Sequence, residues 1–384
     1  MKILHTADWH LGKIVNGVHM TEDQAEVLKQ VIQIIRQEKP DVMIIAGDVY
    51  DRSVPPKEAV ELLDQTLTEL ITDFNMPILI TSGNHDSPDR LHFGSRLFRE
   101  NNLFIETKLS EKIPKITLTD QSGPVHFHLI PYVEPADVRP MFPDHKIQTH
   151  QEAMEQIVQQ IKSNEDMNER HVLIAHAFIT GGMESDSEER LSMIGGSPYI
   201  DAHIFHDFHY VALGHLHQPQ KVSKETIRYS GSLLKYSFSE ANHKKSVTMI
   251  ELDDCGKADI ERIPLHPKRD MRIIEGYFND IISNEDIAPS EDYLHVRLLD
   301  DGQLLDPIGK LRKKFPNVLR LERKAKQSNL GLHEMKQIRE KQQMSHTQLF
   351  EAFYQEMKGE EIPPNRAEHI HRTVDQLMKQ EREQ

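Results

Sequence analysis

Five short apolar runs within the first 220 residues each lead into polar side chains of the kinds that bind metals or transfer protons. The runs read "KILHTADWH", "DVMIIAGD", "PILITSGNH", "HVLIAH" and "YVALGHLH". Each is short enough for a buried strand. A polar turn after a strand explains any one of them, since Gly, Asn, Asp and Ser are common turn residues. Their recurrence is what points to a shared site.

Helical patterns separate the first three runs. One keeps the i, i+3, i+4, i+7 spacing behind Thr21 and Gln24, which we expect to form a capping box; its apolar positions are Leu28, Val31, Ile32 and Ile35. The other follows Pro55 and Pro56, and its apolar positions are Val60, Leu63, Leu67, Leu70 and Ile71. Alternation of strands and helices predicts an α/β core, which binds ligands beyond the carboxyl ends of its strands.

All the polar clusters fall at such strand ends. They comprise Asp8, His10, Asp48, Asn84, His85, His176, His215 and His217. A lone Asp in this position could cap a helix, but an ionised carboxylate drawn toward a core costs several kcal/mol without compensation. Together the clusters predict a shared cation site. Histidine with carboxylate suits Mn, Fe or Zn better than calcium, which prefers oxygen ligands.

Composition adds two limits. The chain has 384 residues, one cysteine (Cys255) and no apolar run approaching the roughly 18 residues of a membrane span, so we expect a soluble, cytoplasmic protein. Its 46 Lys and Arg against 61 Asp and Glu give a net charge of −15, which argues against a surface that attracts nucleic acid everywhere. Binding to phosphate would need basic patches or bound divalent cations.

The pattern changes after residue 265. "MRIIEGYF", "YLHVRLLD" and "NVLRLERK" alternate like half-buried strands, and "PIGKLRKKF" between the last two predicts a helix with Pro307 near its start. These elements indicate a small α+β module. Residues 325–344 are polar with little apolar period and predict a linker. Two amphipathic helical patterns follow in 345–384.

The motifs as a set resemble the calcineurin-like metallophosphoesterases. They are Asp8-x-His10, Gly47-Asp48, Gly83-Asn84-His85-Asp86, His176 after an apolar strand, and Gly214-His215-x-His217. Within that superfamily the opening "MKILHTADWHLGK", the segment "GDVYDRSVPP" and the later "ALGHLHQPQ" are similar to the SbcD family of bacterial nuclease subunits. The resemblance implies a four-layer sandwich, in which two central β-sheets are flanked by helices.

It also implies a division of the chain. We expect a nuclease domain over 1–265, a DNA-capping domain over 266–324, the linker 325–344, and a C-terminal helical segment over 345–384 that docks an ATPase. Five apolar side chains of the first C-terminal helix and three of the second would contact that partner: Leu349, Phe350, Phe353, Tyr354, Met357, Ile370, Val374 and Leu377.

The resemblance assigns roles at the site. One metal would be held by Asp8, His10, Asp48 and His217, and a second by Asn84, His176 and His215, with Asp48 as the bridge. Manganese is the expected ion, with magnesium and iron as alternatives. His85 would face the phosphate. Asp86 would orient His85 or cap the helix starting near Pro88. Asp51 stands where some relatives have a histidine, so that histidine's role does not transfer.

The implied activity is that of a metal-dependent DNA nuclease, a 3′–5′ exonuclease on duplexes and an endonuclease on single strands and hairpins, in an ATP-driven repair and recombination complex. A phosphodiesterase or phosphatase acting on a small or protein substrate is the alternative, and a non-catalytic scaffold is a third possibility. The extra C-terminal module disfavours the second, and the complete ligand set with His85 disfavours the third.

The implied partners are DNA, an SbcC-type coiled-coil ATPase and a second copy of the chain. The homodimer would form through helices at about 56–73 and 88–100, giving a heterotetramer with the ATPase in a nucleoid-associated complex. Five basic side chains near the motifs are candidates for DNA contacts, although a solvated charge explains each one equally well. They are Lys13, Arg52, Lys57, Arg90 and Lys235.

Overall fold

The computed structural model describes residues 1–110, 112–188, 198–283, 288–301 and 304–323, and the isolated residues 354, 362–363 and 366–367. The chain divides into two compact units, one of residues 1–300 with 304–323 and one of 301–303 with 324–384. The first unit carries every element described below. No helix among the described residues is long and apolar enough to cross a membrane.

The first sheet contains strands from both ends of the region 1–265. In spatial order its strands are β14 (Ala258–Pro264), β13 (Ser246–Leu252), β1 (Lys2–Thr6), β4 (Val42–Ala46), β5 (Ile78–Thr81) and β6 (Leu103–Glu106). Strands β1, β4, β5 and β6 run parallel, whereas β13 pairs antiparallel with both β1 and β14. The four parallel strands therefore present their carboxyl ends at one edge.

The second sheet also has six strands. Their order is β11 (Gln220–Val222), β12 (Lys224–Tyr229), β10 (Tyr210–Gly214), β9 (Arg170–His176), β8 (Gly123–Ile130) and β7 (Lys115–Asp120). Strands β12, β10, β9 and β8 are parallel, and β11 and β7 close the two edges antiparallel. A separate short hairpin joins β2 (Ile14–Val15) and β3 (Val18–His19).

The two sheets pack face to face because their strands are apolar on both sides. In β4, Val42, Ile44 and Ala46 point into the core between the sheets, while Met43 and Ile45 point to the outer layer. This follows from the two-residue period of a strand. Between the sheets these side chains meet those of β8, β9 and β10.

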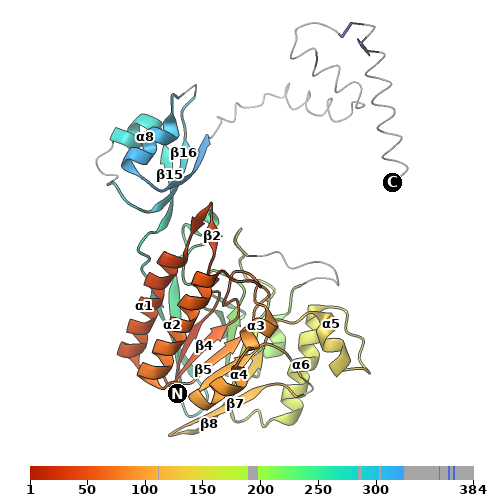
Figure 1. The fold of residues 1–384 in the computed structure, drawn as a ribbon. Coiled ribbons are helices and arrows are strands. Elements are labelled where there is room, and N and C mark those ends of the chain that lie inside the picture. Colours follow the sequence, from red (N-terminus) through yellow and green to blue (C-terminus); the bar gives the residue numbers. More distant parts are fainter. Residues whose placement is uncertain are drawn as a thin grey trace. The chain divides into compact units, whose positions relative to one another are not determined.

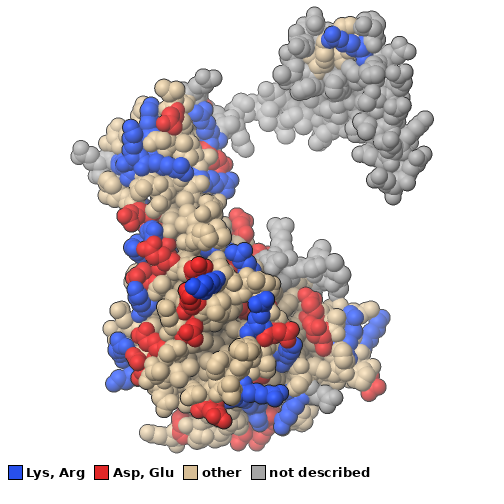
Figure 2. Space-filling view, in the orientation of Figure 1, with Lys and Arg blue, Asp and Glu red and all other residues tan. Residues whose placement is uncertain are grey.

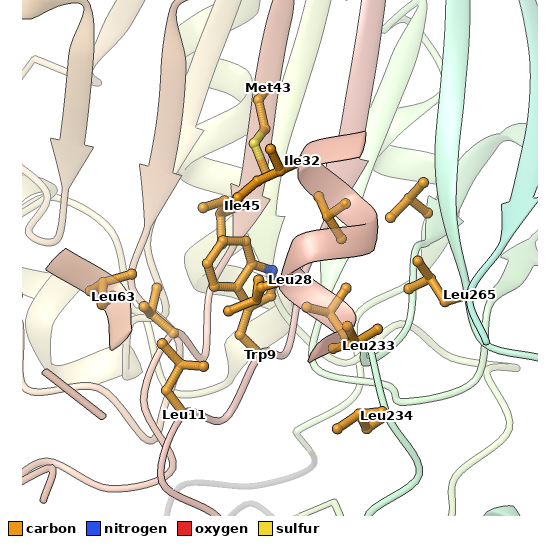
Figure 3. Packing of buried hydrophobic residues seen from close by; sticks show 14 of the residues in the cluster. Trp9, Leu11, Leu28, Ile32, Met43, Ile45, Leu63, Leu233, Leu234 and Leu265 are labelled. Atoms are coloured by element: carbon orange, nitrogen blue, oxygen red, sulfur yellow. The ribbon is translucent and has the colours of Figure 1, made fainter. Parts of the chain in front are cut away.

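Helices cover both outer faces. Helices α1 (Thr21–Glu38) and α2 (Lys57–Phe74) lie side by side over the first sheet (Figure 1). Trp9, fully buried, packs there against Leu28 and Ile45 (Figure 3). The second sheet is covered by α6 (His150–Asn164) and η3 (Ala202–Phe205). The layers helix, sheet, sheet, helix confirm the predicted sandwich.

Shorter helices fill the connections of the sandwich. They are α3 (Pro88–His92), α4 (Ser95–Phe98), η1 (Arg99–Asn101), α5 (Pro135–Val138), η2 (Arg139–Met141) and η4 (Phe238–Glu240). The prediction of one helix over 88–100 is wrong, because the helix is interrupted at Phe93 and Gly94. Gly94 has a φ of +77°, which is not helical.

The last described elements form a three-stranded parallel sheet with two helices. The strands are β15 (Met271–Gly276), β16 (Tyr293–Leu298) and β17 (Val318–Arg323), and the helices are α7 (Phe278–Ser283) and α8 (Pro307–Lys314). They share their own small core. The three predicted strands and the helix at Pro307 are present, whereas α7 was not predicted. Lys and Arg gather on this module (Figure 2).

Candidate metal centre

The carboxyl ends of five parallel strands bring the predicted ligands together. From the first sheet, Asp8 and His10 follow β1, Asp48 follows β4, and Asn84 and His85 follow β5. From the second sheet, His176 ends β9, and His215 and His217 follow β10. The side chains meet because both sheets turn the same edge toward one place, as expected for ligand sites of α/β cores.

One half of the cluster is built around His10. Its Nε2 lies 3.0 Å from Nε2 of His217 and 3.6 Å from Oδ2 of Asp48. Ligand atoms of Asp8, His10 and Asp48 all lie within 4.8 Å of one another. All four side chains are buried. These are the groups that the family resemblance assigns to the first metal.

The other half is built around His176. Its Nε2 lies 3.4 Å from Oδ2 of Asp48 and 3.1 Å from Oδ1 of Asn84. Nδ1 of His215 lies 3.2 Å from the same Asn84 oxygen. Asp48 therefore lies near members of both halves.

The backbone at the cluster is held in unusual conformations. Asp8, His10 and Asp48 have φ near +50°, and His215 has a φ of +110°. Such conformations cost on the order of 1–3 kcal/mol each for residues other than glycine, and they concentrate at functional sites. Glycine is required where chains pass closest: a Cβ on Gly214 would collide with the carbonyl of Ala46.

Burial and mutual charge shift the pKa values of the cluster in opposite directions. Burial raises the pKa of Asp8 to about 7 and lowers that of His10 to about 3. Burial also disfavours charge on His176, but the Asp48 carboxylate outweighs it and raises the pKa of His176 to about 9. A divalent cation would displace that proton, because a histidine ligand must be neutral.

The donor set fits divalent cations. Oδ2 of Asp8 is fully buried and has no hydrogen-bond partner among the described residues. An unpartnered buried carboxylate oxygen is costly unless a cation compensates it. The facing ring nitrogens of His10 and His217 give a second reason, since two imidazole lone pairs at 3.0 Å need a proton or a metal between them. A mixture of imidazole, carboxylate and amide oxygen suits a transition metal.

His85 is placed differently from the ligands. Its backbone NH donates to Oδ1 of Asp48 at 2.9 Å, and its ring Nδ1 lies 2.8 Å from the carbonyl oxygen of Asp51. A carbonyl only accepts, so Nδ1 carries the hydrogen and Nε2 carries the lone pair. The Asp51 carboxylate forms an ion pair with Lys13 at 2.7 Å and lies 3.6 Å from Nδ1 of His10.

Asp86 directs its carboxylate to the backbone of the site loops. The carboxylate accepts hydrogen bonds from the backbone NH groups of Val49, Tyr50 and Gly83 at 2.9–3.1 Å. The prediction that it orients His85 is therefore corrected: Asp86 ties together the loops after β4 and β5. It does not cap α3 either, whose N-cap residue is Ser87. Burial raises the pKa of Asp86 to about 6.

A buried ion pair behind His217 was not predicted. Nδ1 of His217 lies 2.7 Å from the hydroxyl of Ser187 and 3.4 Å from Oε1 of Glu240. Glu240 in turn pairs with Lys245, and the ammonium of Lys245 donates to the carbonyl of His217 at 2.7 Å. Although burial disfavours charge on Glu240, Lys245 holds its pKa well below the usual value. No strand-end motif marks these residues, so no local pattern could have indicated them.

Gln24 supports the loop that carries His10. Its amide nitrogen donates to the carbonyls of Trp9 and His10, and its oxygen accepts from Gly12. The predicted capping box of Thr21 and Gln24 is wrong, because the N-cap of α1 is Met20 and no side chain caps it. Gln24 is important for the loop before the helix and not for the helix end.

The candidate DNA contacts differ in exposure. Arg52 and Arg90 are exposed, and the side chain of Lys57 is 80% exposed beside Glu61. Lys235 was wrongly assigned: its ammonium donates to Ala241 and pairs with Asp270 at 2.9 Å, which leaves the side chain 10% exposed. Lys13 is half-buried in its pair with Asp51.

The predicted partner-binding residues lie outside the described part of the chain, apart from Tyr354. They are Leu349, Phe350, Phe353, Met357, Ile370, Val374 and Leu377. The linker 325–344 lies outside it as well.

Comparison with known proteins places the chain in a family. A model described as calcineurin-like phosphoesterase matches residues 1–219, and a model described as type 5 capsule protein repressor C-terminal domain, named SbcD_C, matches 267–358. The SbcD subunit of nuclease SbcCD from Staphylococcus epidermidis is 41% identical over 322 residues, or 84% of this chain and 85% of that protein. The protein of the same name from Staphylococcus saprophyticus is 35% identical over 381 residues, 99% of each chain. The chain therefore belongs to the calcineurin-like phosphoesterases and, within them, to the SbcD family of SbcCD nuclease subunits.

Proposed function

We propose that this chain is the metal-dependent nuclease subunit of an SbcC–SbcD type complex and hydrolyses phosphodiester bonds of DNA at the cluster of strand-end ligands. The single observation that carries the proposal is that seven side chains of metal-binding types meet at one buried place, with His85 beside them; the seven are Asp8, His10, Asp48, Asn84, His176, His215 and His217. The enzyme would digest duplex DNA as an exonuclease in the 3′–5′ direction and would cut single strands and hairpins as an endonuclease.

Each side chain has a proposed role. Asp8, His10, Asp48 and His217 would hold one ion, and Asn84, His176 and His215 would hold the other, with Asp48 as a ligand to both, since it lies near both His10 and His176. Manganese is the ion proposed, with magnesium and iron as alternatives, because ligand type alone does not decide among them. When bound, two such ions supply Lewis acidity to the phosphodiester and activate water for in-line attack.

His85 is proposed as the group that serves the leaving oxygen. The Asp51 carbonyl fixes its Nδ1, so that Nε2 is the nitrogen that can take up a proton or bind the phosphate. Once protonated, Nε2 can donate to the departing alkoxide. Asp51 thus acts on His85 through its backbone and on Lys13 through its side chain.

The DNA path would use basic groups that the acidic chain gathers locally. A groove of about 550 Å³ is lined by Lys13, the Tyr236–Ser239 segment and the third-sheet residues His295, Arg297 and Arg320. The side chain of Arg320 is 59% exposed. We propose that this groove and the exposed Arg52, Lys57 and Arg90 contact phosphates, in place of the buried Lys235.

Two partners complete the proposal. An apolar pocket of about 350 Å³ is lined by the exposed Val60 of α2, Phe93 after α3 and Phe98 of α4, and Leu97 beside Phe98 is exposed as well. These exposed apolar side chains support a homodimer through this face. Residues 345–384 would dock a coiled-coil ATPase of the SbcC type, giving a heterotetramer. The support for that docking is the sequence pattern and the names of the relatives.

A substrate panel tests the function. The purified chain with manganese is offered labelled duplex DNA, a DNA hairpin, a phosphopeptide and bis-p-nitrophenyl phosphate, beside the Asp48→Ala variant. We expect cleavage of DNA and of the small diester by the native chain alone. Release of phosphate from the phosphopeptide without cleavage of either DNA would favour the phosphatase alternative. Inactivity toward all four substrates would favour the scaffold.

A further inference from the structure

A second group of histidines lies at the other end of β9 from the metal centre. His171 is the second residue of the strand and His176 the last, so the two are about 16 Å apart at roughly 3.3 Å per residue. His126 and His128 stand on the neighbouring strand β8, and Glu169 directly precedes β9. We call His126, His128, Glu169 and His171 the β8–β9 cluster.

Strand register brings the side chains of the cluster to one face. Thr117, His126 and His171 are direct neighbours across β7, β8 and β9. His128 shares the face of His126 because it is two residues further along β8. The rings of His126 and His128 both stack against that of His171, with centroids 4.9 and 5.2 Å away.

The nitrogen and oxygen atoms of the cluster already point at one another. Nε2 of His128 lies 2.9 Å from Nδ1 of His171, and Nε2 of His126 lies 2.9 Å from Oε2 of Glu169. Ligand atoms of His126, Glu169 and His171 fall within 4.8 Å of one another. Tetrahedral zinc holds its ligand atoms about 3.4 Å apart, given bonds of about 2.0–2.2 Å. His128 lies outside that group and joins it through its contact with His171. Rotation of the half-exposed Glu169 side chain and small shifts of the three rings would bring the four ligand atoms to this spacing.

A hydrogen bond at the opposite ring nitrogen fixes the tautomer of His171. Nε2 of His171 lies 3.0 Å from the backbone carbonyl of Asp166, which can only accept, so Nδ1 of His171 carries the lone pair. Nδ1 of His126 lies 2.9 Å from the hydroxyl of Thr117, and Nε2 of His126 donates its hydrogen to the Glu169 carboxylate. Nε2 of His128 likewise donates to Nδ1 of His171, so a metal ion would take the places of these two hydrogens, which would move to Nδ1 of each ring. Metal-binding histidines are held in this way by carbonyls and other polar groups.

The buried rings are also neutral, as metal ligands must be. Burial lowers the pKa of His128 to about 3 and lowers the pKa of His171. His128 is 1% exposed and His171 is fully buried, so little water competes for their nitrogens. Protons would therefore not displace a metal at neutral pH.

We propose that the β8–β9 cluster binds a zinc ion through Nε2 of His126, Nε2 of His128, Nδ1 of His171 and a carboxylate oxygen of Glu169. Three imidazoles and one carboxylate complete a tetrahedral shell and leave no open position, which is typical of a structural and not a catalytic site. The ion would fasten the turn after α6, which contains Asp166 and Glu169, to the middle of the second sheet.

Zinc stoichiometry of the full-length chain tests the site. The metal-stripped protein is dialysed against Zn²⁺ and its bound metal is counted for the native chain, Glu169→Gln and Glu165→Gln. Glu165 is the matched control, because it lies in the same turn and loses the same charge but pairs with Lys115 outside the cluster. We expect Glu169→Gln to bind one equivalent of zinc fewer than the native chain, and Glu165→Gln to bind as much as the native chain. Equal zinc in the native chain and Glu169→Gln would overturn the proposal and leave a network of neutral imidazoles.

A second variant keeps the test independent of the ligand change. Thr117→Val suits an exposed strand position and removes only the hydroxyl beside His126. It should weaken the extra zinc equivalent about 10- to 100-fold, the effect of losing a group that orients a ligand. Manganese-dependent cleavage of bis-p-nitrophenyl phosphate should stay unchanged in Glu169→Gln. Loss of this cleavage in Glu169→Gln would show that the β8–β9 cluster is not independent of the metal centre.

Discussion

At the scale of single residues, the metal centre separates groups that would hold ions from one that would serve the phosphate. Asn84 and His85 are adjacent in sequence, yet Asn84 turns its oxygen to His176 and His215, whereas the ring of His85 is held by the Asp51 carbonyl. A pair of neighbouring residues thus reaches two different functions. The loop after β5 achieves this because Asp86 anchors it through the backbone NH of Gly83.

His85→Ala should abolish most cleavage without loss of metal. Removing a group that transfers a proton costs typically 10²- to 10⁴-fold in rate. The metal should stay because Asn84, and not His85, supplies the oxygen that faces His176 and His215. Metal analysis and single-turnover cleavage are measured together, with Asp48→Ala as the contrasting variant that should lose both metal and activity. Loss of an ion from His85→Ala would contradict the assignment.

Glu240→Gln should weaken both folding and metal binding, for different reasons. It leaves the charge of Lys245 buried and unpaired, which costs about 3–5 kcal/mol. It also replaces the carboxylate behind His217 with an uncharged amide, which should lower manganese affinity about 10- to 100-fold. Urea unfolding and manganese titration measure the two effects.

A double variant separates these effects. In Glu240→Gln with Lys245→Met neither charge remains, so stability should recover largely while manganese affinity stays low. If affinity recovers together with stability, Glu240 acts only on folding and has no positioning role toward His217.

At the scale of elements, the strands carry buried histidines whose protonation is linked to folding. His5 on β1 lies between the sheets with its Nδ1 3.0 Å from the hydroxyl of Tyr210, and burial lowers its pKa to about 3. In the unfolded chain the pKa returns to about 6.5. The unfolded state therefore binds the proton first, and stability is lost as pH falls from about 6.5 toward 3.

His5→Gln should flatten this dependence. Between pH 7.5 and pH 5, the native chain should lose about 2 kcal/mol of unfolding free energy through His5 alone. Urea unfolding with chelator at both pH values gives the loss for native chain, His5→Gln and the exposed control His19→Gln. The control should keep the native slope. An equal slope in all three proteins would show that His5 does not contribute.

A second prediction at this scale concerns the apolar surface formed by α4 and by Phe93, which follows α3. Phe93 and Leu97 are 83% and 72% exposed, which is unusual for two large apolar side chains so close together. Leu97→Asp should shift the proposed dimer to monomer in sedimentation at micromolar concentration. Leu305→Asp is the control, since Leu305 is 84% exposed but lies in the third-sheet module. A native chain that is monomeric throughout would refute the dimer.

The sequence predicted the secondary-structure elements better than it predicted the long-range contacts that hold the proposed ligands in place. The strands, and the clustering of the proposed ligands at their ends, could be predicted because each proposed ligand directly follows an apolar run, which is a local pattern. The contacts of Glu240 and Lys245 could not, since they reach His217 only after β10 and β13 have paired with different sheets. For the same reason Lys235 was mistaken for an exposed cation, because its partner Asp270 is distant in sequence.

At the scale of the whole molecule, the chain is acidic, so positive charge for binding DNA would come from local groups of basic side chains and from bound metal ions. The net charge is −15, yet α8 ends in Arg312, Lys313 and Lys314, and basic side chains cover its module (Figure 2). Two bound divalent ions would add about +4 at the reacting phosphate. An acidic surface elsewhere disfavours binding to DNA outside these places.

Deletion of residues 345–384 should remove partner binding while sparing the metal centre. The segment belongs to the second compact unit, whereas every proposed ligand lies in the first. Its first amphipathic pattern has five large apolar side chains, which would contribute about 7–15 kcal/mol if fully buried, against association costs of about 4–15 kcal/mol. The second pattern, with Ile370, Val374 and Leu377, should therefore be needed for firm binding.

Pull-down of an SbcC-type ATPase and manganese-dependent cleavage of a short single-stranded substrate measure the two properties side by side. Full-length chain, the deletion and a triple variant Ile370→Ser, Val374→Ser, Leu377→Ser are compared. We expect partner binding to vanish in the deletion and to weaken in the triple variant, because part of the apolar surface remains. Cleavage should persist in both, since the first unit keeps its whole ligand set. Unchanged binding, or loss of cleavage in the deletion, would assign the segment to the nuclease core and not to the docking surface.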